Sequence, residues 1–173
     1  NGMGGDIFAI VWDAKSKQLY GLNGSGRSPK SLNLQWFKDN GYDKIPSHGP
    51  LPVTVPGAVD GWFMLHQRFG QMPMKKILQP TIDYAEKGFP VTQLIAYYWN
   101  RSVPILEKWP GFTEQMTLDG QAPKEGDIWK NQNLANTLKL IAKQGRDVFY
   151  KGEIAHTIAD YMHANDGHLS YQD

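Results

Sequence analysis

The glycine-rich loop at residues 23–29 carries the side chain whose chemistry is most readily connected with substrate binding. Arg27 offers a planar guanidinium that can donate two parallel hydrogen bonds to a carboxylate. Gly24 and Gly26 permit backbone conformations that other residues resist, so the loop can also present N–H groups to a ligand. A surface loop with a solvated arginine explains the same residues, and the pattern alone leaves both interpretations open.

The remaining ionisable side chains do not form a recognisable catalytic or metal-binding pattern. The histidines lack the i, i+4 pair flanking a helical glutamate that a zincin site requires; they are His48, His66, His156, His163 and His168. The aspartates show no paired spacing that singles out a site; those considered are Asp6, Asp13, Asp60, Asp83, Asp119, Asp127 and Asp160. We interpret Asp60 as a first-turn residue that favours a helix dipole. The sequence therefore predicts no metal site.

Composition removes several other classes of protein. The chain has 173 residues and no cysteine, which excludes disulfide scaffolds, cysteine-based zinc sites, iron–sulfur clusters and a thiol nucleophile. With 18 Lys+Arg against 17 Asp+Glu, the net charge is +1, and no basic block or stripe is present. We therefore expect no nucleic-acid partner. No apolar run approaches the ~20 residues that a membrane-spanning helix needs.

A strand pair is predicted at the start of the chain. Residues 6–12 are short, β-branched, aromatic and almost continuously apolar, which favours a strand buried on both faces. Residues 13–17 are typical of a turn, and residues 18–22 can return as the second strand of a hairpin.

The rest of the chain is predicted to be mostly helical. Between Gly41 and Pro56, prolines and glycines disfavour regular structure until a helix begins near Gly57, with Thr54 as its cap and Pro56 in its first turn. Gly70 ends that helix. Apolar residues at helical spacing predict further helices at residues 74–87, 92–109, 134–145 and 154–167, with a loop at 110–131. The fold class is α+β, in about one ordinary domain.

Several stretches in order resemble one family, the large subunit of gamma-glutamyltranspeptidase-like proteins. They are Gly2-Met3-Gly4-Gly5-Asp6, the run from Tyr20 to Pro29, the run from Leu51 to Trp62, Phe69-Gly70-Gln71-Met72-Pro73, the run from Tyr84 to Val91, Gln132-Asn133-Leu134-Ala135 and Phe149-Tyr150-Lys151-Gly152. The resemblance extends across nearly the whole chain.

The resemblance implies an N-terminal-nucleophile hydrolase with an αββα sandwich, made as a precursor that cuts itself into two subunits. Residues 1–173 would be a single internal fragment of the large subunit. The nucleophile would be the N-terminal threonine of the small subunit, downstream of Asp173, so no catalytic residue is assigned here. That threonine would form an acyl-enzyme from glutathione or another gamma-glutamyl amide. The family implies the small subunit as partner, no metal or organic cofactor, and a periplasmic or secreted location.

One arginine of the large subunit grips the alpha-carboxylate of the substrate in this family, in a segment that resembles residues 23–29. Arg27 is the arginine available there, and Ser25 and Asn23 are candidates for further hydrogen bonds to the substrate. Better-known members carry Phe-Arg-Glu ahead of Ala-Pro, whereas Arg27 directly precedes Ser28-Pro29, and Asp6 replaces a further glycine. Both departures indicate a divergent subgroup.

Two other functions stay open. Within the same fold, the protein would be an acylase that removes glutaryl-like side chains from beta-lactam nuclei, or an enzyme that cleaves gamma-linked polyglutamate. Outside enzymology, it would be a relative that has lost the threonine and acts as a binding or structural protein. The sequence downstream of Asp173 distinguishes these possibilities.

Overall fold

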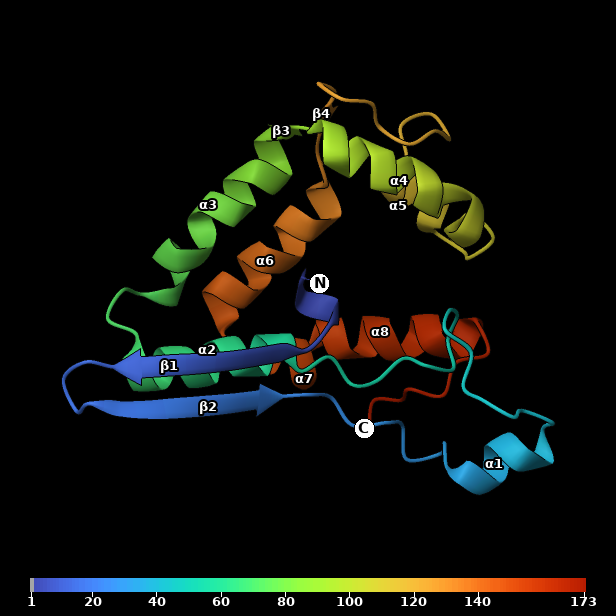
Figure 1. Ribbon diagram of the computed structural model, residues 1–173, viewed down its shortest axis with the longest axis horizontal. Coiled ribbons are helices and arrows are strands. Elements are labelled where there is room, and N and C mark those ends of the chain that lie inside the picture. The colour runs from blue at the N-terminus through green and yellow to red at the C-terminus, as the bar shows by residue number, and fades with distance from the viewer. Residues whose placement is uncertain (1) are drawn as a thin grey trace. The chain divides into compact units, whose positions relative to one another are not determined.

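The computed structural model describes residues 2–173, which form two compact units. The first unit runs to Gln71 and resumes at Gln144–Asp173, and the second is Met72–Lys143. Elements of the first unit are the 3-10 turn η1 (Gly2–Gly4), β1 (Ile7–Asp13), β2 (Gln18–Gly24), α1 (Leu34–Asp39), α2 (Ala58–Phe69), α7 (Asp147–Tyr150) and α8 (Glu153–Ala164) (Figure 1). Elements of the second are α3 (Met74–Lys87), β3 (Phe89–Pro90), α4 (Gln93–Leu106), α5 (Phe112–Met116), β4 (Ile128–Trp129) and α6 (Gln132–Gln144).

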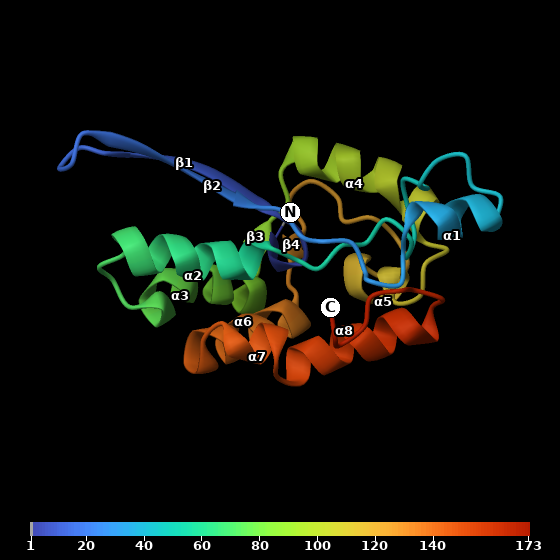
Figure 2. The ribbon, with the colours of Figure 1, turned by 90° about the horizontal axis from the view of Figure 1, so that it is seen from below.

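The predicted hairpin is present, and it is longer than expected. Strands β1 and β2 pair antiparallel from Ile7 opposite Gly24 to Asp13 opposite Gln18. The expectation that this strand is buried on both faces is wrong for the chain as it stands. Burial alternates along β1, and Phe8, Ile10 and Trp12 are at least 60% exposed. Successive side chains of a strand point to opposite faces, and α2 packs along only one of them (Figures 1 and 2).

Helix α2 begins where expected but is capped differently. Its N-cap is Gly57, which has no side chain to accept an N–H, so the prediction of Thr54 as the cap and Pro56 inside the first turn is wrong. Two distant groups replace the missing cap. The Ala58 N–H donates to the Gly5 carbonyl at 2.9 Å, and the Asp60 N–H donates to a tyrosine hydroxyl described below. Early helical N–H groups have no partner within the helix, so these bonds fix the start of α2 to the rest of the first unit.

Close packing joins α2 to the hairpin at Gly61. A Cβ atom at this position would lie 2.1 Å from Ile7 Cγ2, well inside van der Waals contact. Val59, two residues earlier in the same helix, is completely buried. Only a residue without a side chain lets the helix approach β1 this closely.

In the second unit, α3 and α6 lie side by side. Leu78, Ile82 and Ala85 of α3 are buried, and so are three residues of α6, Ala135, Leu138 and Ile141. The Asn131 N–H donates to the Ala85 carbonyl at 2.8 Å, and Lys139 pairs with Glu86. Apolar stripes at helical spacing predicted both helices correctly, because their buried residues recur every three or four positions.

The observed elements confirm the α+β class while correcting several boundaries. Helix α3 has the predicted bounds with Pro80 inside it, whereas α4, with Pro104 inside it, ends at Leu106 instead of residue 109, and α8 ends at Ala164 instead of residue 167. The segment expected as a loop at 110–131 contains α5 and β4, and the short helix α1 was not predicted. These elements have six residues or fewer, too few to show a period. Among the described residues, no helix is both long and apolar enough to cross a bilayer.

Gly61→Ala tests the packing between α2 and the hairpin. Glycine to alanine inside a loosely packed helix stabilises a protein by about 1 kcal/mol. Here the new methyl group collides with Ile7, so we expect the free energy of unfolding to fall by about 1–3 kcal/mol in urea denaturation. Gly21→Ala in β2, where no atom lies within 4 Å of the new Cβ, is the matched control. The free energy of unfolding of the double variant Gly61→Ala/Ile7→Ala should fall by less than the sum of the falls in the two single variants. An increase in the free energy of unfolding of Gly61→Ala would contradict the packing.

Candidate functional site

A cleft of about 340 Å³ opens in the first unit beside the loop that follows β2. Four segments contribute its walls: the loop after β2, the entry to α2, the helices α7 and α8, and the C-terminal segment. The lining residues are Ser25, Gly26, Arg27, Val55, Pro56, Gly57, Asp60, Arg146, Phe149, Tyr150, Lys151, Ala155, Ile158, Leu169, Ser170, Tyr171 and Asp173. Apolar walls with a few convergent polar groups are typical of small-molecule sites.

The loop after β2 is held in shape by Asp6, which precedes β1. The Asp6 carboxylate accepts the Gly26 N–H at 2.9 Å and the Ser25 hydroxyl at 3.4 Å. Asn23 Oδ1 accepts the Ser25 N–H at 3.0 Å. Asp6 therefore has a structural role, since its carboxylate accepts a backbone N–H of the loop that leads to Arg27.

Arg27 is anchored through its backbone while its side chain stays available. The Val55 N–H donates to the Arg27 carbonyl at 2.9 Å. The side chain is exposed and lines the cleft, and within residues 2–173 its guanidinium forms no hydrogen bond or ion pair. An unpaired guanidinium on a backbone fixed at the edge of a cleft can receive a carboxylate in bidentate fashion.

The backbone of residues 24–27 lies unusually close to the backbone of residues 54–57. A Cβ at Gly26 would lie 1.7 Å from the Val55 carbonyl oxygen, and one at Gly57 would lie 2.0 Å from the Gly24 carbonyl oxygen. Neither position tolerates a side chain without movement of backbone atoms. The glycines of both segments therefore allow two segments of the chain to approach each other closely, which the sequence alone did not show.

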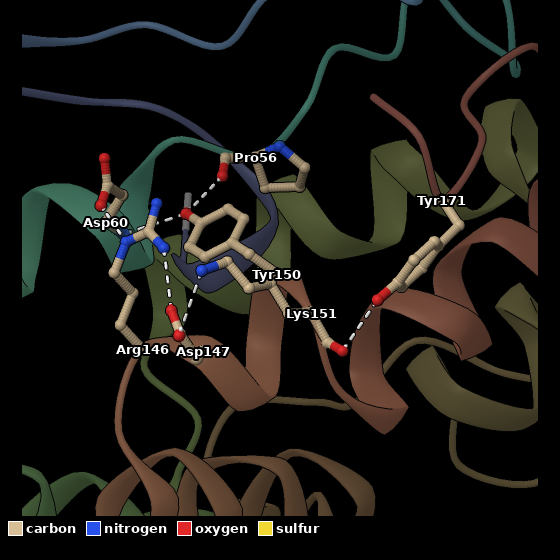
Figure 3. Close-up of polar contacts among 7 residues, drawn as sticks. All are labelled: Pro56, Asp60, Arg146, Asp147, Tyr150, Lys151 and Tyr171. Atoms are coloured by element: carbon tan, nitrogen blue, oxygen red, sulfur yellow. Dashed lines mark hydrogen bonds and ion pairs between the residues drawn. The ribbon is translucent and has the colours of Figure 1, made fainter.

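A polar network built around Tyr150 closes the inner wall of the cleft (Figure 3). The Tyr150 hydroxyl donates to the Pro56 carbonyl at 2.7 Å and accepts the Asp60 N–H at 2.9 Å. Arg146 pairs with the carboxylates of Asp60 and Asp147, and its guanidinium lies 4.6 Å from the centroid of the Tyr150 ring.

The network also sets the charge states of its members. The hydrogen bond to Asp60 raises the pKa of Arg146 above its ordinary value, so the guanidinium stays charged. Burial raises the pKa of Tyr150, which keeps its hydroxyl protonated and able to donate. Hydrogen bonds from Lys151 and Arg146 lower the pKa of Asp147. Arg146 is thus already neutralised by two carboxylates, whereas Arg27 is not.

The C-terminal segment forms the opposite wall. Asp173 accepts the Lys30 N–H at 2.9 Å and the Ser170 N–H and hydroxyl at 2.8 Å each. Burial raises the pKa of the Asp173 carboxyl, but these hydrogen bonds outweigh it, and the net pKa is lowered. The Tyr171 hydroxyl donates to the Lys151 carbonyl at 2.9 Å, and its ring stacks on His156.

The structure brings together two of the three residues proposed from the sequence. Arg27 and Ser25 line the cleft, and Asn23 does not; Asn23 instead supports the turn at Ser25. Sequence reasoning missed Tyr150 and Arg146 as cleft residues and interpreted Asp60 only as a first-turn residue. Asp60 does lie in the first turn of α2, and it also pairs with Arg146. The 86 positions between them explain why no spacing could reveal the pair.

No group of three or more His, Asp or Glu side chains is placed to hold a metal ion among residues 2–173. His156 and His163 lie on α8, one against Tyr171 and the other in the last turn. His168 contacts Ser31 and the ring of Trp36.

The sequence profile of gamma-glutamyltranspeptidase matches residues 1–173, the whole chain. The chain belongs to the gamma-glutamyltranspeptidase family. A curated relative from Bacillus subtilis, the glutathione hydrolase-like YwrD proenzyme, is 33% identical over 173 residues, which are 99% of this chain and 33% of the relative. The chain thus spans about a third of the length of that curated relative.

Solved structures agree with the family and with the fold class. The cephalosporin acylase from Bacillus halodurans superposes with a TM-score of 0.92 at 38% identity, over 99% of this chain and 33% of that one. The gamma-glutamyltranspeptidase from Helicobacter pylori superposes with a TM-score of 0.93 at 25% identity, over 99% of this chain and 50% of that one. The resemblance drawn from the sequence motifs is confirmed.

Asp173→Asn tests how the C-terminal wall is held. Because the native pKa of Asp173 is lowered, its contribution to stability is fully present above the unfolded value of about 3.9 and is lost as the pH falls through the native value. The free energies of unfolding of the wild-type and variant proteins should therefore differ most above about pH 5, and the difference should shrink only as the pH falls below about 4 and through the lowered native pKa. Acid titration of urea unfolding measures this; a difference that stays constant down to pH 2 would refute the role of the carboxylate.

Proposed function

We propose that this chain is an internal part of the large subunit of a gamma-glutamyl hydrolase or transferase. In this proposal Arg27 binds the alpha-carboxylate of the acyl donor, which is glutathione or a related gamma-glutamyl amide. The observation that carries the proposal is the unpaired guanidinium of Arg27 at a cleft whose other arginine is already paired. The nearby Ser25 supplies a hydroxyl that can form a hydrogen bond with the donor. Asn23 does not contact the donor; its side chain accepts the Ser25 N–H and so holds the Ser25 backbone.

The chemistry that this assignment serves is acyl transfer through a threonine outside the chain. The threonine oxygen attacks the gamma-carbonyl carbon of the donor, the C–N bond breaks, and the amine leaves with a proton. Water or an acceptor amine then attacks the acyl-enzyme and releases the gamma-glutamyl group. Arg27 takes no part in bond breaking; it holds the far end of the acyl group so that the gamma-carbonyl stays in reach.

A partner that completes the fold is part of the same proposal. Phe8, Ile10, Trp12 and Leu19 share the outer face of the hairpin, and each is at least 60% exposed. A two-stranded ribbon with an apolar face open to water is marginally stable by itself. The second sheet of an αββα sandwich, contributed by the rest of the precursor and its small subunit, would cover this face.

A second candidate is an acylase that removes glutaryl-like groups, and the 38% identity to the cephalosporin acylase from Bacillus halodurans favours it. A glutaryl group ends in a carboxylate at the position of the gamma-glutamyl alpha-carboxylate and lacks only the amino group. Arg27 can bind either one, so groups that recognise the ammonium, outside this chain, would decide between the two donors. Comparing the kcat/KM of the complete enzyme for a gamma-glutamyl and a glutaryl anilide distinguishes the candidates.

Arg27→Ala in the complete enzyme tests the binding role directly. Loss of a charged hydrogen-bond pair should lower kcat/KM by about 10- to 100-fold, mainly through a higher KM. Self-cleavage should be unaffected, because the precursor cuts itself without a bound donor. Arg101→Ala, an exposed arginine of the second unit that bonds to Tyr97, is the control and should leave KM unchanged. An unchanged KM in Arg27→Ala would remove Arg27 from the site.

The intact mass of the complete protein under denaturing conditions tests the enzyme class. We expect two fragments, the smaller of which begins with threonine, and turnover of a gamma-glutamyl anilide by the same sample. A single uncut chain without turnover would instead support a non-catalytic binding or structural relative. A cut protein that turns over only the glutaryl anilide would favour the acylase.

A further inference from the structure

Tyr150 is bonded to the chain segment that carries the backbone anchor of Arg27. Its hydroxyl donates to the Pro56 carbonyl at 2.7 Å and accepts the Asp60 N–H at 2.9 Å. The residue before Pro56 is Val55, whose N–H donates to the Arg27 carbonyl at 2.9 Å. One phenol therefore fixes both the entry to α2 and, through one peptide unit, the backbone of Arg27.

The backbones of residues 24–27 and 55–57 cannot move far relative to each other. Gly26 and Gly57 lie so close to the facing backbone that a Cβ on either would overlap a carbonyl oxygen. A displacement of residues 55–57 must therefore be followed by residues 24–27 or else break the Val55–Arg27 hydrogen bond. Tightly packed backbones transmit small shifts in this way because they cannot be compressed.

The Tyr150 ring is itself held in place. The Arg146 guanidinium lies over the ring at 4.6 Å from its centroid and is fixed by Asp60 and Asp147, as Figure 3 shows. Phe149, which is buried, meets the ring at its edge with 4.9 Å between centroids. The hydroxyl therefore has a defined position relative to α7, and α2 and the Arg27 loop are aligned to it.

We propose that Tyr150 is a positioning residue for substrate binding, which sets the place of the Arg27 guanidinium through the Pro56 carbonyl and the Val55–Arg27 hydrogen bond. This inference rests on the proposed function, because it requires Arg27 to bind the donor carboxylate. Tyr150 itself touches no reacting atom. Its hydroxyl acts on the affinity for donors that carry the carboxylate.

Tyr150→Phe in the complete enzyme removes the hydroxyl and keeps the ring. We expect KM for a gamma-glutamyl anilide to rise about three- to tenfold, with kcat changed less than twofold. The decisive measurement is the double variant with Arg27→Ala. If Tyr150 acts through Arg27, adding Tyr150→Phe to Arg27→Ala should raise KM by less than twofold further, because the group it positions is already gone.

Tyr171→Phe is the matched control for this cycle. It also removes a phenol hydroxyl that donates to a backbone carbonyl, that of Lys151 at 2.9 Å, in the wall of the same cleft. Figure 3 shows this bond to Lys151, and among residues 2–173 the Tyr171 hydroxyl forms no hydrogen bond with residues 55–56 or Arg27. Whatever the effect of Tyr171→Phe alone on KM, its fold-change in KM should multiply with that of Arg27→Ala in the double variant.

Three results overturn the inference in distinguishable ways. If the fold-increases in KM caused by Tyr150→Phe and Arg27→Ala multiply in the double variant, Tyr150 does not act through Arg27, and the proposed function is left intact. An unchanged KM for Arg27→Ala would refute both. An unchanged KM for Tyr150→Phe would refute the inference alone. If Tyr150→Phe does not fold, as judged by self-cleavage and thermal melting, 4-fluorophenylalanine at position 150 keeps the ring shape without the O–H, and the same cycle decides.

Discussion

The close approach of two backbone segments, residues 24–27 and 54–57, is the constraint on which the first unit depends. Gly26 and Gly57 allow carbonyl oxygens to come nearer than any side chain would tolerate. The Val55 N–H then reaches the Arg27 carbonyl, so the end of β2 and the entry to α2 become one structural element. This contact fixes both the start of a helix and the loop that presents the candidate binding residue.

The first N–H groups of α2 bind acceptors from distant parts of the chain. A glycine at the N-cap cannot provide the usual side-chain acceptor. The Gly5 carbonyl and the Tyr150 hydroxyl supply acceptors instead, from residues 53 and 90 positions away from the N–H groups they bind. Two of the first N–H groups of α2 therefore find their acceptors only when the unit around the helix is assembled.

The electrostatics of the cleft distinguish its two arginines. Arg146 forms ion pairs with two carboxylates and lies against the Tyr150 ring. Its charge therefore stabilises the wall of the cleft. Arg27 has a fixed backbone, and its guanidinium has no hydrogen-bond or ion-pair partner among residues 2–173. A carboxylate ligand gains most from a cation that is not already neutralised, which is why we propose Arg27, and not Arg146, as the group that binds the carboxylate of the donor.

The sequence by itself determined the family, the α+β class, the hairpin and the long helices, because ordered motifs and apolar periods are local properties of the chain. It also pointed to Arg27, since a guanidinium in a glycine-rich loop has recognisable chemistry. Only the tertiary structure decided that Asp6 holds the loop, that Asp60 pairs with Arg146, and that Tyr150 caps α2. Each of these contacts joins residues 20 or more positions apart, and no local pattern encodes which distant side chain will meet which backbone group.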